Sequence, residues 1–115
     1  MNTAAKDLLR SGLGDYRLKS FAWSEDGNDV LLVLRPPGVA AQDQCVRFIW
    51  ATKVRIDLDF GSYAGMPLLF ECRFATQGTT GIHRVHLQFG GAPDGEISLE
   101  CNDAVVEVED STDTD

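Results

Sequence analysis

The last 25 residues of the sequence lack basic side chains. Residues 91–115 contain nine Asp and Glu and no Lys or Arg, whereas residues 1–90 contain ten bases against nine acids. The net charge of −8 is therefore confined to one end of the chain. A patch of one sign attracts cationic partners and repels nucleic acid and anionic membranes. The charge distribution argues against nucleic-acid and membrane binding and favours a basic protein as partner.

Long apolar runs are also missing. No stretch approaches the roughly 18 apolar residues that a membrane helix needs. The segment Met1–Asp7 has neither the basic start nor the apolar run of a secretory signal. We therefore expect a cytoplasmic protein.

Cysteine and histidine are scarce. The chain has an odd number of cysteines, Cys45, Cys72 and Cys101, and no two of them form a C-x-x-C pair. We therefore expect buried free thiols rather than a disulfide framework. His83 and His86 lie three apart in a strand-like segment, where their rings point to opposite faces and cannot close on one ion. We expect no metal site and no cofactor.

Few residues are arranged for catalysis. Asp57 and Asp59 share one face of a predicted strand, which is a spacing compatible with glycoside chemistry. Lys53 and Arg55 lie on the same face, so a salt-bridged sheet surface is the better interpretation. The glycines form no phosphate-binding motif. We therefore expect that the protein is not an enzyme.

The residues that are present predict one helix followed by strands. A helix is expected over Thr3–Arg10, where Thr3 can cap the start and Gly12 and Gly14 end it. After Gly14 the apolar period changes to two, which is typical of strands. The predicted strands are Tyr16–Trp23, Asp29–Arg35, Cys45–Trp50, Lys53–Phe60, Phe70–Phe74, Arg84–Phe89, Glu96–Cys101 and Val106–Glu109.

This pattern indicates the fold class. Lys53–Phe60 has the clearest alternation of apolar and charged residues. Seven or eight short strands without crossover helices predict a mainly β fold, an antiparallel sandwich or partly closed barrel with a short N-terminal helix. A chain of this length has room for one core. We predict a single all-β domain over residues 1–109 and an acidic C-terminal tail over residues 110–115.

The last two predicted strands and their connection contain the acids on which the charge argument depends. Only Asn102 and Asp103 separate them, a connection able to take positive φ, so we expect a tight antiparallel hairpin. Its acids would share one outer face, where like charges side by side destabilise a sheet. A solvated acidic edge is one explanation. The other is a docking surface for a basic protein, made by Glu96, Glu100, Asp103, Glu107 and Glu109.

The two tryptophans allow two interpretations. Trp23 and Trp50 either fill the core, which is the commoner role, or anchor an interface, because large amphipathic aromatics dominate contact energetics. We include Trp50 in the predicted partner-binding set.

Three segments resemble the small β-rich immunity proteins of bacterial toxin systems, nearest to the immunity protein 50 type. They are Ile49–Phe60, Ile82–Phe89 and especially Gly95–Val108, with the sequence GEISLEC-ND-AVVEV. The resemblance covers about residues 16–109. It implies an intracellular protein that binds one cognate toxin domain and blocks its active site or its access to substrate. If the toxin is a nuclease, an acidic surface would mimic the phosphate backbone and bind with salt-sensitive kinetics.

We therefore predict an immunity or inhibitor protein that neutralises a cognate, basic toxin domain. Two alternatives stay open. One is a small-ligand-binding β-barrel without catalytic activity, whose mouth is the site. The other is a hydrolase that uses Asp57, Asp59 or His86.

Overall fold

The computed structural model describes residues 3–38, 42–58, 68–77, 81–90 and 95–108, which form one short helix and eight strands. The elements are α1 (Thr3–Arg10), β1 (Arg17–Trp23), β2 (Val30–Arg35), β3 (Gln44–Ile49), β4 (Thr52–Asp57), β5 (Leu68–Gln77), β6 (Ile82–Gly90), β7 (Gly95–Cys101) and β8 (Asp103–Val108). The strands form one antiparallel sheet that is not closed into a barrel, in the order β4-β7-β6-β5-β1-β2-β3-β8. The predicted helix and the mainly β class are confirmed.

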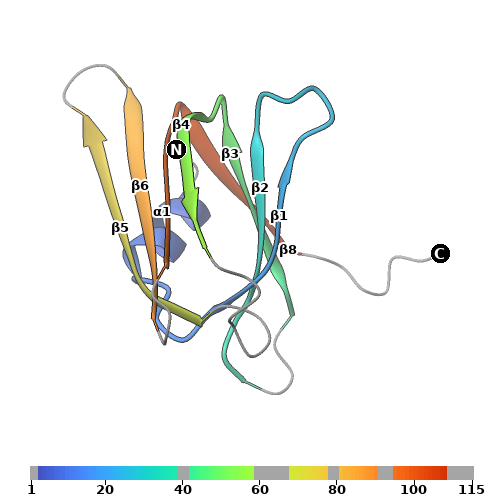
Figure 1. Ribbon diagram of the computed structural model, residues 1–115, viewed down its shortest axis with the longest axis vertical. Helices are drawn as coiled ribbons and strands as arrows, with labels where there is room; N and C mark the ends of the chain where they lie inside the picture. Colours follow the sequence, from blue (N-terminus) through green and yellow to red (C-terminus); the bar gives the residue numbers. More distant parts are fainter. Residues whose placement is uncertain (1–2, 39–41, 59–67, 78–80, 91–94, 109–115) are drawn as a thin grey trace.

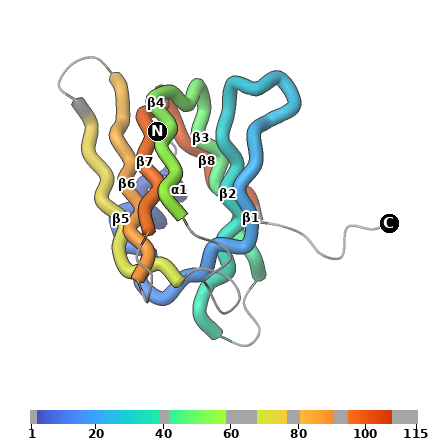
Figure 2. The backbone as a smooth tube through the Cα atoms, viewed as in Figure 1, coloured from blue at the N-terminus to red at the C-terminus, as the bar shows by residue number. Residues whose placement is uncertain are grey.

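The sheet consists of two halves of four strands that face each other (Figure 1). We call β4-β7-β6-β5 the β5 half and β1-β2-β3-β8 the β2 half. They join where Arg17 of β1 pairs with Leu68 of β5, and the backbones of Tyr16 and Leu69 hydrogen bond beside this pair. Figure 2 shows β5, β6 and β7 together on one side and β1 and β2 on the other, with α1 behind.

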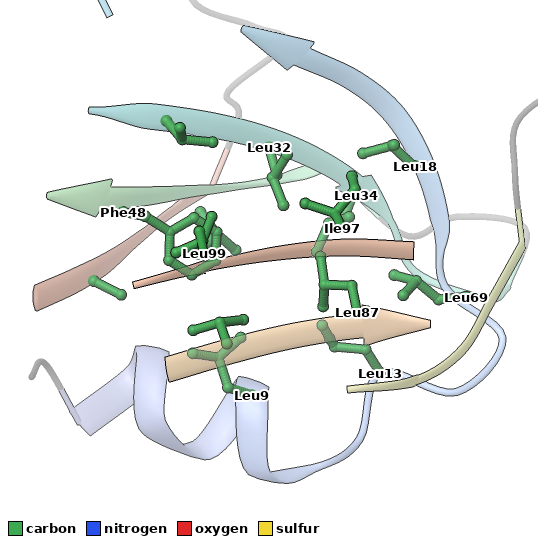
Figure 3. Packing of buried hydrophobic residues seen from close by; sticks show 14 of the residues in the cluster. Leu9, Leu13, Leu18, Leu32, Leu34, Phe48, Leu69, Leu87, Ile97 and Leu99 are labelled. Carbon is green, nitrogen blue, oxygen red and sulfur yellow. The ribbon is translucent and has the colours of Figure 1, made fainter. Parts of the chain in front are cut away.

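The inner faces of both halves enclose one hydrophobic core (Figure 3). Leu32 of β2, Phe48 of β3 and Leu87 of β6 are each at most 1% exposed. Leu9 of α1 enters the same core, because α1 packs against β5 and β8. Each fully buried side chain of this size stabilises the fold by about 1.5–3 kcal/mol relative to an exposed one. The interior is therefore a packed core built from both halves.

The predicted hairpin of the last two strands is wrong. β7 pairs with β6 and β4, whereas β8 pairs with β3. A two-residue hairpin of the type I′ needs positive φ at both central residues. Neither Asn102 nor Asp103 has a positive φ, so the chain bends at Asn102 and continues in the extended direction.

The bend belongs to a ribbon that is shared by the two halves. β3 leads into β4 with only Trp50 and Ala51 between them, as β7 leads into β8 through Asn102. The Asn102 amide donates to the Ile49 carbonyl at 2.9 Å, between the β3–β8 and β4–β7 ladders. Trp50 and Lys53 have positive φ values of 54° and 51°. The residues with positive φ therefore lie between β3 and β4 and at the start of β4, not at the predicted turn Asn102–Asp103.

Candidate functional site

The predicted acidic residues do not share one surface. Glu96 and Glu100 lie on β7 in the β5 half, whereas Glu107 lies on the edge strand β8 of the β2 half. Asp103 is half-buried at the bend between them, and Glu109 is outside the described residues. The expectation of a single acidic hairpin face is wrong because the two strands diverge after Cys101.

Two of the acids are matched by cationic or ionisable side chains within the β5 half. Glu100 is only 11% exposed at its side chain, and its carboxylate lies 3.2 Å from Arg84 Nη2 and 3.7 Å from Lys53 Nζ. Glu96 Oε1 lies 3.1 Å from His86 Nε2. The Glu100 charge is therefore offset by two internal cations, whereas the His86 imidazole would offset the Glu96 charge only in its protonated form.

Glu107 is different. It is exposed on β8, opposite Cys45 of β3, and it has no ion-pair partner among the residues that the structure describes. Beyond Glu107 the sequence adds four more acids in residues 109–115 and no base. Glu107 is therefore an exposed described acid at the start of the acid-rich end of the sequence.

The outer face of the β5 half is a lattice of charged and polar side chains, which we call the charged outer face. Cross-strand neighbours follow one another in rows, such as Arg55, Ser98, His86 and Arg73 from β4 to β5. The next row contains Asp57, Glu96, Gln88 and Glu71. Because opposite charges alternate between these rows, the surface is close to neutral and well solvated.

An open depression of about 340 Å³ lies on the charged outer face, and its lining includes Asp57, His86 and Glu96. It brings together two of the residues that the hydrolase hypothesis names, Asp57 and His86. The third, Asp59, is outside the described residues. A carboxylate beside an imidazole can orient that ring as a base. The Glu96 side chain is 42% exposed, so water competes for this pair, and the hydrolase stays an untested alternative.

His83 lies on the opposite face of β6 from His86, as the strand period predicts. It is 7% exposed, its Nδ1 is 2.9 Å from Thr76 Oγ1, and its ring lies beside that of Phe74. Burial is the largest cause that lowers the pKa of His83 below its ordinary value. No group of three potential ligands capable of holding a metal occurs among the described residues.

Both tryptophans are at the surface, so of the two interpretations the core one is wrong. Trp50 is 56% exposed and Trp23 is 50% exposed. Trp23 packs edge-on against Phe21, whereas the Trp50 amide donates to Asp29 Oδ1 at 3.1 Å. Asp29 thus holds Trp50 in its positive-φ conformation at the bend. This exposure fits an anchor, and the binding role of Trp50 remains a prediction.

A second outer surface was not anticipated from the sequence. The outward positions of β2, β3 and β8 carry the half-buried residues Leu31, Val33, Cys45, Ile49 and Val105, which we call the apolar outer face. The signal for it is the unbroken apolar run of β2, which places apolar residues on both faces of a strand. An alternation argument overlooks such a run because it has no polar face.

Comparisons with known proteins add no family to this picture: no protein-family model matches the chain, and no curated protein matches it. Within the described residues, α1 is too short to cross a membrane.

Proposed function

We propose that this chain is an immunity or inhibitor protein that binds a cation-rich toxin domain and neutralises it in the cytoplasm. The observation that carries the proposal is the exposed Glu107 carboxylate on β8. Glu107 is free of internal cations among the described residues, and the acids at 109, 110, 113 and 115 follow it in sequence. A partner that approaches β8 would therefore meet the Glu107 carboxylate.

The acids on β7 take a smaller part in the proposal than the sequence alone suggests. Glu100 already lies between Arg84 and Lys53, so a partner's cation would compete with two internal ones. Charged groups at the rim of an interface mainly raise the association rate and improve discrimination between partners. The exposed position of Glu107 supports that role.

Trp50 supplies the apolar part of the proposed contact. Exposed tryptophans contribute strongly to interfaces because they bury a large area when a partner covers them. Asp29 accepts a hydrogen bond from the Trp50 backbone amide, which restrains the backbone that carries the exposed indole.

The test is calorimetric titration of the full chain with the purified toxin domain encoded beside its gene. We expect a one-to-one complex that weakens by about fivefold or more between about 50 and 300 mM salt. Failure to bind at the lower salt concentration would end the proposal.

A pair of single substitutions locates the charge effect. Glu107→Gln should slow association by about two- to threefold, because it removes an unmatched acid at the rim. Glu25→Gln removes another exposed acid, from the β1–β2 turn, and should leave the rate unchanged. Equal effects of both substitutions would contradict docking at β8.

A further inference from the structure

We propose that strand β4 binds strand β4 of a second copy of this chain, antiparallel and centred on Ile56, so that the two sheets join at their edges. The inference goes beyond the proposed function and does not depend on it. The pairing uses β4, whereas Glu107 lies on β8 at the other end of the strand order. The two proposals can therefore fail separately.

β4 is an edge strand. It ends the strand order, and β7 is its one neighbour among the described strands (Figure 2). An edge strand presents backbone N–H and C=O groups on its free side, which a further strand can pair with. All residues of β4 except Val54 are exposed. β8, the edge strand at the other end, has helix α1 packed against it.

The inner face of β4 has an exposed apolar centre. Ile56 lies opposite Ile97 of β7, whose side chain is buried, so both point to the inner side of the sheet. Val54 and Leu58 on the same face pack against the core, whereas Ile56 between them is 44% exposed. Because burial in a sheet needs neighbours on both sides, a second Ile56 beyond the edge would bury both side chains.

The outer face of β4 carries opposite charges on the two sides of Ile56. Arg55 precedes Ile56 and Asp57 follows it. Neither Arg55 nor Asp57 has an ion-pair partner among the described residues. Asp57 lies directly opposite Glu96 of β7, and like charges in that position destabilise a pair of strands. A cation on the free side of Asp57 would offset this repulsion.

These residues make β4 self-complementary in one antiparallel register. With Ile56 opposite Ile56 of the second copy, Arg55 lies opposite Asp57. Val54 lies opposite Leu58 in the same register. Side chains directly opposite each other share a face, so apolar groups meet on the inner face and opposite charges meet on the outer face. Moving the centre by one residue places Arg55 opposite Arg55, or Asp57 opposite Asp57. The charges therefore select the register.

The strand β8 lacks this symmetry. Its sequence, DAVVEV, contains acids and no base, so two copies of β8 form no pair of opposite charges. The expected β4 dimer is itself weak. A register bulge between Thr52 and Arg55 shortens the regular part of β4, and a net charge of −8 on each copy opposes approach. We expect a dissociation constant of about 10–100 µM.

The first test is sedimentation equilibrium of the full-length protein from about 5 to 500 µM, where we expect a monomer–dimer equilibrium. Arg55→Asp and Asp57→Arg should each weaken the dimer at least about tenfold, because each places like charges opposite each other twice. The double variant with both substitutions should restore it. Both residues are exposed, so we expect the variants to fold, which far-UV circular dichroism checks.

Mixing the two single variants is the sharpest arm of this test. A chain with Arg55→Asp presents two acids, and a chain with Asp57→Arg presents two bases. We therefore expect a mixed dimer at least as tight as that of the wild type, although neither variant associates with itself. Glu107→Arg, on the other edge strand, is the control and should leave the wild-type dimer unchanged.

Cysteine cross-linking tests the register. Ile56 is the one position of β4 that faces its own counterpart, so Ile56→Cys should form a disulfide between two copies on mild oxidation. Thr52→Cys, also exposed on β4, is the matched control. Its counterpart lies far along the paired strand, and we expect it to cross-link at least about fivefold more slowly.

The outcomes distinguish this contact from others. A monomer at every concentration would overturn the inference, as would a dimer that both charge reversals leave intact. Single variants that fail to associate on mixing would overturn the pairing of Arg55 with Asp57. Loss of the dimer in Glu107→Arg would place the contact at β8. A β4 dimer in a protein that does not bind the toxin domain would keep this inference and end the proposed function.

Discussion

At the scale of single residues, burial controls the chemistry of two thiols. Desolvation raises the pKa of Cys72 and of Cys101 to about 12, with smaller contributions from Glu71 and Asp103 respectively. The thiolate is the reactive form, so both thiols are protected near neutral pH. We expect iodoacetamide at pH 8 to label them at least about a hundredfold more slowly in the native protein than in urea.

The same pKa shifts predict the direction in which stability changes at alkaline pH. The folded state holds the two thiol protons more tightly than the unfolded state, whose value is near 9. The free energy of unfolding should therefore fall as the pH rises from about 9 towards 12. Rapid labelling of both thiols at pH 8 without denaturant would contradict the packing of β5 and β7.

His83 gives the opposite dependence, at acid pH. Its pKa in the folded state lies below the ordinary 6.5, mainly because the ring is buried. Its contribution to stability is complete above pH 6.5 and is lost as the pH falls through the folded-state value. Urea unfolding at pH 7.5 and 5.0 should show a decline in the wild type that is smaller in His83→Gln.

His86→Gln is the matched control for that measurement. It removes an imidazole from the outer face of the same strand and leaves His83 in the interior. We expect this variant to keep the decline between pH 7.5 and 5.0. An equal flattening by both substitutions would mean that the buried position of His83 is not the cause.

Residue pairings lie beyond what the sequence could predict. Glu100 was assigned to a docking face, yet Arg84 lies 16 positions from it in the chain and Lys53 is farther still. Both contacts depend on which strands become neighbours. The burial and free state of Cys101, by contrast, follow from its place in an alternating apolar series.

At the scale of elements, the bend between β3 and β4 contains Trp50, one of the described non-glycine residues with a positive φ. Trp50 is bulky, yet it has a φ of 54°, a conformation that costs such residues about 1–3 kcal/mol. Glycine adopts it freely. The Trp50→Gly variant should therefore have a free energy of unfolding up to about 1 kcal/mol higher than that of the Trp50→Ala variant, as measured by urea titration.

The two substitutions also separate stability from binding. Each removes the exposed indole, so both should weaken the toxin complex to the same extent if Trp50 is an anchor. Trp23→Ala, at similar exposure, is the control for loss of surface area. A stability of Trp50→Gly below that of Trp50→Ala would show that the positive φ is not strained.

The sequence pattern predicted which segments form strands, but it did not predict which strands lie at the edge or at the centre of the sheet. The clearest alternation, in Lys53–Phe60, belongs to β4, which turns out to be an edge strand with Ile56 44% exposed. Alternation reports that one face is apolar, and burial also needs neighbours on both sides. β2 lacks alternation and is a central strand with its inner face fully buried.

At the scale of the whole molecule, the class of fold followed from the sequence and the topology did not. Short strands without crossover helices are enough to predict an antiparallel β protein. The continuation of β7 into β8 depends on pairing with β3 and β4, whose partner residues are 39 to 64 positions away in the chain. A tight turn and a bend at Asn102 look alike in the sequence. This difference moved the expected docking side from β7 to β8.

The most direct measurement of the central claim is carboxylate footprinting of the free protein and of its toxin complex. Carbodiimide coupling followed by peptide mass analysis reports which acids a partner covers. Docking at β8 predicts loss of labelling at Glu107, with Asp57 and Glu71 of the charged outer face labelled as before. Protection of Asp57 and Glu71 with Glu107 still labelled would contradict the account.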